Sequence, residues 1–427
     1  MKDLDTFILA GGKGNRFQSI SKLPKIFAKL GKTKLIDIIL KNLKKNKINR
    51  VNILAGKNHK IIKNYLEANY NKLNINIVSE DTLLGTAGCF SKVKKKYLRE
   101  NILIIFGDLL FDIDLKKFNH FHLKKNSDIT ILTHPSDHLF DSDILEVDSK
   151  NQVKKIYFKP HKKDILVHNL TMAGIFIIKK KCLNLIPHNK KYDFSKNFLK
   201  DALNNKSKIF SYKTREYCKD LGTPTRFKKV NKDFKLNKNK LFRLNKKIRA
   251  VFLDRDGVIN VDQGPLKYSS PLNFLPNSVN ALSKLRKLNY LVILITNQSA
   301  VAKGFITINE LEKSFKSLET ILSKKSIYFD SIYYCPHYPT SGYKKENKNY
   351  KINCSCRKPK PGMILRAKRD FNIDLKKSFF VGDSLKDYMA AKASKVKPII
   401  LQKLEKKEVD YIYKKDLLAA IKYIERK

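Results

Sequence analysis

The chain has 427 residues, of which 42% are hydrophobic and 10% aromatic, and its 89 lysines and arginines outnumber its 39 aspartates and glutamates by 50. At roughly 150 residues per domain, this length excludes a single small module, and the apolar content excludes a globally disordered chain. The positive charge favours anionic partners, but it is spread evenly along the chain, so it indicates phosphate-bearing ligands only weakly and we do not expect nucleic acid binding.

Location and redox state follow from what the sequence lacks. No apolar run approaches the ~18 residues of a membrane helix. The first residues, MKDLDTFILAGG, do not have the pattern of a secretory signal, and six cysteines do not make a disulfide scaffold of this length. We therefore expect a cytoplasmic protein that does not bind membranes. The sequence does not predict its oligomeric state.

Short runs rich in β-branched residues alternate with amphipathic stretches, in two series. Buried runs of about 4–8 residues separated by helical patterns are typical of parallel sheets. The sequence therefore predicts an α/β fold with two doubly wound, mainly parallel-sheet domains. The strands expected in the first series are Asp5–Ala10, Val51–Ala55, Ile75–Val78, Ile102–Phe106 and Ile129–Leu132. Those expected in the second are Ala250–Leu253, Leu291–Ile295, Phe379–Val381 and Lys397–Leu401.

A basic segment separates the two series. Residues 228–249 carry ten lysines or arginines and one aspartate, with no glycine or proline. This composition predicts a polar helix that leads into a short connector, with the boundary near Asn245. We expect one domain at residues 1–230, a basic helix and linker at 231–247, and a second domain at 248–427.

The first predicted strand runs into the glycine-rich loop LAGGKGNRF. Gly11, Gly12 and Gly14 would let backbone N–H groups close around phosphate, where side chains would block the approach. Two common phosphate loops are excluded. A dinucleotide fingerprint needs glycine where Phe17 stands, and a P-loop needs serine or threonine after its lysine, where Lys13 precedes glycine. What remains is G-G-x-G-x-R with a downstream Pro-Lys pair.

In this pattern Arg16 and Lys25 would supply positive charge to a triphosphate. Together with four later segments, it resembles the sugar-1-phosphate nucleotidyltransferase family over roughly residues 1–230. Those segments are EDTLLGTAG (Glu80 to Gly88), IIFGD (Ile104 to Asp108), NLTMAG (Asn169 to Gly174) and DLGTP (Asp220 to Pro224). The resemblance implies a Rossmann-like domain in which a sugar phosphate attacks the α-phosphate of a nucleoside triphosphate.

The resemblance also implies roles for single residues. Glu80 and Gly85 would contact the base, Asp108 and Asp220 would hold Mg²⁺, and Asn169 would face the sugar. For Asp220 a simple turn remains an alternative. The family usually has Glu-Lys-Pro where this chain has Phe158-Lys159-Pro160, so Lys159 would still meet the sugar phosphate without the neighbouring carboxylate.

The second series opens with AVFLDRDGVIN, in which one strand delivers Asp254 and Asp256 to the same side. Asp254 would attack a phosphate ester to form an aspartyl-phosphate, and Asp256 would protonate the leaving oxygen and then activate water. A calcium loop is the alternative, but its glutamate and its spacing are absent. This half resembles the haloacid dehalogenase-like phosphatases. The resemblance implies that Thr296 binds a phosphate oxygen and that Asp383 holds Mg²⁺ with both aspartates.

Further side chains complete this expected site. Asn297, Arg357 and Lys358 would bind the substrate, Lys358 acting in catalysis as well, and whether Asp387 touches metal stays open. Between these motifs lie Cys335, His337, Cys354 and Cys356, spaced C-x-H-x16-C-x-C. Two close pairs of soft ligands predict a closed, structural Zn²⁺ site in a long loop. The three other cysteines are isolated, and we assign them to packing.

The zinc loop followed by CRKPKPGM narrows the resemblance to the heptose bisphosphate phosphatases, with the histidinol-phosphate phosphatases somewhat less similar. The first half resembles most the heptose 1-phosphate guanylyltransferases, which favours GTP as the nucleotide. The two resemblances together imply a chain that dephosphorylates a heptose bisphosphate and converts the product to GDP-heptose for a surface polysaccharide. Three alternatives remain: another sugar phosphate with CTP, UTP or dTTP, a first half that acts only as a non-catalytic scaffold, and one that binds nucleic acid.

Overall fold

The computed structural model describes residues 4–12, 17, 23–70, 74–79, 83–162, 164–264, 272–404 and 410–427. The chain forms two compact units. The first comprises residues 1–134, 142–160 and 170–243, and the second comprises residues 135–141, 161–169 and 244–427. None of the helices in the described ranges is long and apolar enough to cross a membrane.

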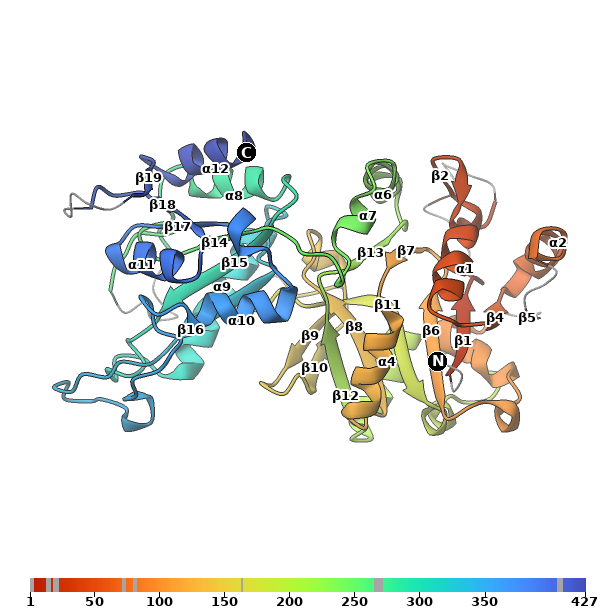
Figure 1. The fold of residues 1–427 in the computed structure, drawn as a ribbon. Coiled ribbons are helices and arrows are strands. Elements are labelled where there is room, and N and C mark those ends of the chain that lie inside the picture. Colours follow the sequence, from red (N-terminus) through yellow and green to blue (C-terminus); the bar gives the residue numbers. More distant parts are fainter. Residues whose placement is uncertain are drawn as a thin grey trace. The chain divides into compact units, whose positions relative to one another are not determined.

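A nine-stranded mixed sheet forms the centre of the first unit (Figure 1). Its main path runs β10–β9–β11–β6–β1–β4–β5, and β8 lies between β11 and β12. The five predicted strands are present, but β11 is antiparallel to both β6 and β8, so the sheet is mixed. The strands are β1 (Leu4–Leu9), β4 (Arg50–Leu54), β5 (Asn74–Val78), β6 (Asn101–Phe106), β8 (Ile129–His134), β9 (Ile144–Val147), β10 (Val153–Tyr157), β11 (Thr171–Lys179) and β12 (Ile209–Lys213).

Two small antiparallel pairs accompany this sheet. They are β2 (Lys29–Leu30) with β3 (Thr33–Lys34), and β7 (Leu109–Asp112) with β13 (Tyr217–Asp220). The helices of the unit are α1 (Leu35–Lys45), α2 (His59–Tyr70), α3 (Gly85–Gly88), α4 (Leu115–Lys124), α5 (Lys200–Asn204), α6 (Pro224–Lys235) and α7 (Lys238–Leu241). The last two occupy the basic segment predicted as a polar helix, and the continuous part of the second unit begins at Leu244.

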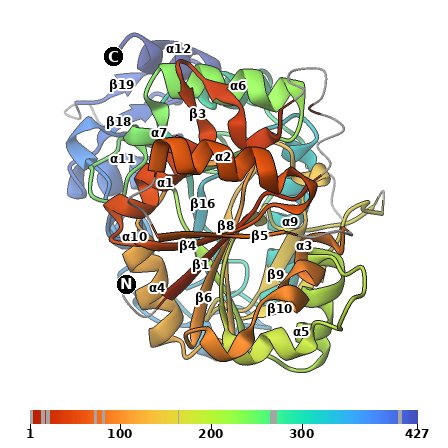
Figure 2. The same cartoon turned by 90° about the vertical axis from the view of Figure 1, so that its right-hand side faces the viewer.

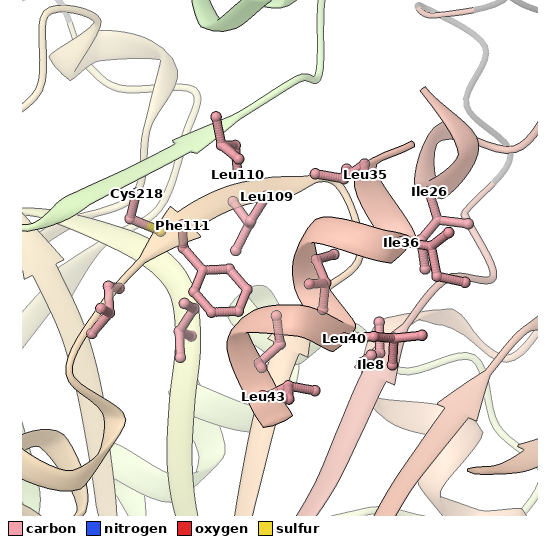
Figure 3. Close-up of a cluster of buried hydrophobic side chains, with 14 of the residues drawn as sticks. Ile8, Ile26, Leu35, Ile36, Leu40, Leu43, Leu109, Leu110, Phe111 and Cys218 are labelled. Carbon is pink, nitrogen blue, oxygen red and sulfur yellow. The ribbon is translucent and has the colours of Figure 1, made fainter. Parts of the chain in front are cut away.

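Helices α1 and α2 cover one face of the strands β1, β4 and β6 (Figure 2). Ile36, Leu40 and Leu43 of α1 recur at helical spacing and are buried, so one side of this helix is apolar. Figure 3 shows them in one cluster with Leu109 and Phe111 of β7. Burying each such side chain contributes roughly 1.5–3 kcal/mol. This cluster holds the β6–β7 turn, which carries a predicted metal ligand, against the sheet.

The second unit is built on a six-stranded sheet in which every neighbouring pair is parallel, as predicted. The order β16–β15–β14–β17–β18–β19 places the first strand of the unit in the middle, which is the arrangement of a doubly wound fold. The strands are β14 (Ala250–Leu253), β15 (Leu291–Asn297), β16 (Ser331–Cys335), β17 (Phe379–Gly382), β18 (Lys397–Ile400) and β19 (Ile412–Tyr413).

Alternate residues of the central strands enter different layers. Val251 and Leu253 of β14 belong to the core that α8, α9 and α12 complete, and Phe252 between them is also buried. Helix α9 begins with a capping box, in which Thr307 and Glu310 satisfy each other's backbone N–H groups. The helices are α8 (Ser278–Leu285), α9 (Ile308–Ser323), α10 (Gly362–Phe371), α11 (Leu385–Ala393) and α12 (Leu417–Glu425).

Two short segments from the first half of the chain, 135–141 and 161–169, belong to the second unit. His168 lies between two carboxylates of α9, with Nδ1 2.6 Å from Glu319 Oε2 and Nε2 3.1 Å from Glu312 Oε2. Burial of the ring opposes its charge, but the hydrogen bonds and charges of both glutamates raise the pKa of His168 to about 9. An imidazolium is therefore part of the packing of this unit at neutral pH.

Candidate active sites

The phosphatase-type motifs meet at the carboxyl ends of three neighbouring parallel strands. Strand β14 ends one residue before Asp254, β15 carries Thr296 near its end, and β17 ends one residue before Asp383. Gly257 follows with a φ of 74°, and a Cβ added there would lie 1.9 Å from the Asp383 carboxylate. Only glycine therefore fits where this turn approaches Asp383.

Asp254 and Lys358 form a buried ion pair at the centre of this site. The Nζ atom of Lys358 lies 2.8 Å from Asp254 Oδ2 and 2.6 Å from Asp387 Oδ1. Burial opposes the charge of the lysine, but the two carboxylates raise its pKa overall. Burial also raises the pKa of Asp254, which Lys358 partly offsets. The lysine therefore stays protonated and holds one oxygen of the predicted nucleophile in place.

Three carboxylates of this site have oxygens within 4.8 Å of one another, namely those of Asp254, Asp383 and Asp387. Hard oxygen donors at this density fit Mg²⁺. Burial and the charge of the neighbouring Asp387 raise the pKa of Asp383. A divalent cation bound here would relieve this repulsion between the carboxylates and favour their charged forms. This group differs from the predicted one, because it includes Asp387 and does not include Asp256.

The other predicted residues of this site make contacts with defined partners. Asp256 accepts hydrogen bonds from Asn260 Nδ2 at 2.9 Å and from Gln298 Nε2 at 3.0 Å. Asn297 Nδ2 donates to the Lys358 carbonyl and its Oδ1 accepts from the Lys358 N–H, both at 3.0 Å. Both ends of the Asn297 amide thus bond the main chain of Lys358, and the substrate contact of Asn297 stays a prediction.

Cys335, His337, Cys354 and Cys356 come together as one group. The three sulfur–sulfur distances are 3.1, 3.3 and 3.5 Å, and Nδ1 of His337 lies 3.3 Å from Cys356 Sγ. Ligands at Zn–S distances of about 2.3 Å stand roughly 3.8 Å apart in a tetrahedron, so this donor set fits Zn²⁺ with a small expansion. All four protein ligands are present, which is typical of a structural site.

The zinc-loop residues connect to the phosphatase-type site through the main chain. Cys335 lies opposite Asn297 in the β15–β16 register, and its carbonyl accepts from the Gln298 N–H at 2.7 Å. The Arg357 guanidinium donates to the His337 carbonyl at 3.2 Å. The predicted substrate residue Arg357 thus holds the loop that carries His337.

In the first unit, the predicted nucleotide loop follows β1. Gly11 and Gly12 are described there, whereas Gly14, Arg16 and Glu80 lie outside the described residues. A Cβ added to Gly11 would come within 3.3 Å of the Gly56 backbone, and one added to Gly12 would meet no atom within 4 Å. Among the described residues, none therefore packs where a side chain at position 12 would begin.

Lys25 and the two predicted metal carboxylates lie near the same strand ends. Lys25 Nζ is 3.4 Å from Asp108 Oδ2. Asp220 lies opposite Leu109 in the β7–β13 register, and the Leu221 N–H donates to the Asp108 carbonyl, so the two aspartates are neighbours across the strand pair. Loss of solvation raises the pKa of Asp108, and the charge of Lys25 only partly offsets this. Two close carboxylates fit a divalent cation.

Asp220 has a cationic partner of its own. Arg226, in the first turn of α6, donates through Nη1 to both of its oxygens at 3.0 and 3.2 Å. The Gly222 N–H donates to the same carboxylate at 2.8 Å. Asp220 thus takes part in a turn, as the sequence DLGTP suggested, and its carboxylate also lies beside Asp108, as a shared metal site would require.

Two of the predicted sugar-site residues have main-chain or buried partners. The Lys159 N–H donates to Asp143 Oδ1, which places the Lys159 main chain beside β9. Asn169 is only 3% exposed, and its amide bonds the Ser136 backbone in both directions and the Ser323 hydroxyl. Both donors of the Asn169 amide are thus engaged within the protein, so a sugar contact at this residue, which stays a prediction, would have to use the amide oxygen.

Gly85 opens α3 with a φ of 85°, and a Cβ there would lie 2.8 Å from the Tyr192 carbonyl. This close approach explains why the predicted base-contacting segment needs a glycine at this position. Sequence reasoning missed Arg255, Asn260 and Gln298, which surround Asp256. The signal for Gln298 was its place two residues after Thr296, which sends both side chains to one side of β15.

Known proteins match each half separately. The family model described as "Nucleotidyl transferase" matches residues 5–236, and the model described as "Polynucleotide kinase 3 phosphatase" matches residues 261–410. The D-glycero-beta-D-manno-heptose-1,7-bisphosphate 7-phosphatase of Pasteurella multocida is 39% identical over 158 residues, which is 37% of this chain and 83% of that protein. The protein of the same name from Vibrio cholerae is 41% identical over 152 residues, 36% of this chain and 80% of its own length.

Solved structures are similar over single halves as well. The crystal structure of HddC from Yersinia pseudotuberculosis is 24% identical with a TM-score of 0.47, covering 54% of this chain and 99% of that one. The D,D-heptose 1.7-bisphosphate phosphatase from B. bronchiseptica, complexed with magnesium and phosphate, is 28% identical with a TM-score of 0.37. It covers 42% of this chain and 99% of its own.

Proposed function

Because the chain belongs to the nucleotidyl transferase family through residues 5–236 and to the D-glycero-beta-D-manno-heptose-1,7-bisphosphate 7-phosphatases through its second half, we propose that it catalyses two consecutive steps toward GDP-heptose. It is a fusion of a nucleotidyltransferase and a phosphatase, with a role in heptose metabolism. The second half releases phosphate from the 1,7-bisphosphate to leave heptose 1-phosphate. The first half transfers GMP from GTP to that product.

In the phosphatase step, a carboxylate oxygen of Asp254 attacks phosphorus and the bond to the sugar oxygen breaks. Asp256 gives a proton to that oxygen and then takes one from the water that hydrolyses the aspartyl-phosphate. Lys358 orients the nucleophile, and Thr296 offers its hydroxyl to a phosphate oxygen. When bound by Asp254, Asp383 and Asp387, Mg²⁺ would offset the repulsion between the nucleophile and the anionic phosphate.

In the transfer step, the phosphate of heptose 1-phosphate is itself the nucleophile, so no protein nucleophile is needed. It attacks the α-phosphate of GTP, and pyrophosphate leaves. Lys25, beside Asp108, stabilises the charge that builds up on the phosphates. Mg²⁺ held by Asp108 and Asp220 would lower the repulsion between the two anions. GTP is preferred to other triphosphates on the resemblance of IIFGDLLFDIDL and LLGTAG to the guanylyltransferases.

The pairing of the two reactions supports the choice of substrate. The product of the second half, a sugar 1-phosphate, is what a nucleotidyltransferase consumes. Fusion therefore supplies the product at a high local concentration. The single observation that carries the proposal is the buried Asp254–Lys358 pair at a contact of 2.8 Å, next to two further carboxylates.

The test supplies heptose 1,7-bisphosphate, Mg²⁺ and a panel of GTP, CTP, UTP and dTTP to the purified chain, and measures phosphate, pyrophosphate and the nucleotide sugar. We expect GTP to give both releases. Asp254→Asn should abolish both releases with the bisphosphate and keep pyrophosphate release with heptose 1-phosphate. Asp108→Asn should keep phosphate release from the bisphosphate and abolish pyrophosphate release with either substrate. Asp262→Asn, on an exposed carboxylate of the same loop, is the matched control. Phosphate release without any nucleotide transfer would refute the transferase activity proposed for the first half of the chain.

A further inference from the structure

The side chains around Asp256 form a hydrogen-bond network with a fixed polarity. Arg255 is 1% exposed, and its Nη2 donates to Gln298 Oε1 at 3.2 Å. Because a guanidinium only donates, it must face the oxygen of the Gln298 amide and not its nitrogen. The NH₂ end of Gln298 therefore points the other way.

That NH₂ end has two acceptors, one for each hydrogen. Gln298 Nε2 donates to Asp256 Oδ2 at 3.0 Å and to Thr296 Oγ1 at 2.9 Å. Gln298 is 6% exposed, so water does not compete for these contacts. One amide thus links the predicted acid–base residue to the predicted phosphate-binding hydroxyl.

The direction of the bond to Thr296 has a chemical consequence. A hydroxyl that accepts from an amide keeps its own proton free to donate. Thr296 sits at the end of β15, where the phosphate would bind, and a phosphate oxygen only accepts from it. Arg255 thus fixes the orientation of the Gln298 amide. The amide in turn donates to the Thr296 hydroxyl, which leaves the hydroxyl proton available to donate to phosphate.

Asp256 is held by donors alone. Besides Gln298, Arg255 Nε donates to Oδ1 at 3.0 Å and Asn260 Nδ2 donates to Oδ1 at 2.9 Å. Its carboxylate is not one of the group formed by Asp254, Asp383 and Asp387. We infer that Gln298 is a positioning residue of the phosphatase reaction, which fixes the place of Asp256 and the donor direction of Thr296. This inference rests on the proposed phosphatase activity.

The decisive substitution is Gln298→Glu, which has the same shape. Its carboxylate would still accept from Arg255, but it has no hydrogen for Asp256 or Thr296. The Thr296 hydroxyl would then donate to the introduced carboxylate instead of to phosphate. We expect the KM for p-nitrophenyl phosphate and the inhibition constant of inorganic phosphate to rise at least tenfold. Gln298→Leu, which neither donates nor accepts, should raise both constants less.

These constants do not depend on the fraction of folded enzyme, so a merely structural role would leave them unchanged while lowering kcat. Gln402→Glu makes the same amide-to-acid change at an exposed position of the same unit and should change nothing. Phosphate affinity is also measured directly by calorimetry with Mg²⁺, which gives an answer for variants that do not turn over. Equal phosphate affinity in wild type, Gln298→Glu and Gln298→Leu would overturn the inference. A wild type that hydrolyses no phosphomonoester would instead overturn the proposed function.

Discussion

His168 places a positive charge between Glu312 and Glu319, and replacing it with glutamine tests what that charge contributes. The neighbouring groups that share this environment are Tyr334, whose hydroxyl donates to Glu312, and Lys316, whose charge acts on the same carboxylate. Glutamine can still donate one hydrogen bond to a glutamate. The substitution therefore removes mainly the charge.

The magnitude follows from the shift in pKa. The pKa of His168 rises from 6.5 to about 9, and at ~1.36 kcal/mol per unit this gives an upper bound of roughly 3.4 kcal/mol. The side chain is 36% exposed, so solvent screening reduces the expected contribution to about 1–2 kcal/mol. Because the folded pKa of His168 is the higher one, this stability is fully present below pH 6.5 and is lost as the pH rises through about 9.

The assay is urea denaturation of wild type and His168→Gln at pH 6 and pH 10, followed by circular dichroism because the chain has no tryptophan. We expect the variant to be less stable by about 1–2 kcal/mol at pH 6 and nearly equal to wild type at pH 10. His120→Gln, at an exposed position of α4, is the control for the loss of a histidine. An equal deficit at both pH values would refute the reasoning, because a neutral packing role does not depend on protonation.

Four further substitutions test other features. Cys354→Ser should lower the zinc content from one ion per chain to none and lower the melting temperature of the second unit by several degrees; unchanged zinc would contradict the four-ligand site. Gly12→Ala should weaken GTP binding at least tenfold while the free energy of unfolding stays within ~0.5 kcal/mol, whereas Gly85→Ala, forced against the Tyr192 carbonyl, should destabilise the first unit by about 1–3 kcal/mol. Arg226→Gln should lower the Mg²⁺ concentration for half-maximal pyrophosphate release several-fold, because Asp220 loses a competing cation; an unchanged requirement would count against that competition.

The residues that could be predicted from the sequence are those placed by one strand. Asp254, Thr296 and Asp383 each stand at the end of a buried apolar run, and the ends of neighbouring parallel strands meet at one edge of a sheet. The zinc ligands follow the same logic at shorter range, since two close pairs of soft ligands need only one loop to bring them together. In both cases the local sequence pattern was enough to predict which side chains come together.

The rest depends on packing between distant segments. Nothing near Asn169 indicates that Ser136 and Ser323 take up its amide. The antiparallel course of β11 in the sheet also has no local signal, because a buried strand reads the same in either direction. Asp256 was expected among the metal carboxylates by strand parity, but it is not one of the three grouped carboxylates, and its side chain bonds Gln298 and Asn260.

The carbonyl of Cys335, which accepts a hydrogen bond from the Gln298 N–H, joins the predicted zinc loop to the predicted magnesium site through one stretch of backbone. In the proposed reaction zinc takes no part in breaking the phosphate ester, yet the loop that it would close also fixes the backbone from which Gln298 projects. If the proposed function holds, zinc shortage would therefore slow the proposed magnesium-dependent hydrolysis, and with it the supply of sugar 1-phosphate to the first half of the chain. We expect the zinc supply of the cell to limit the rate of the proposed phosphatase step, although zinc does not contact the substrate.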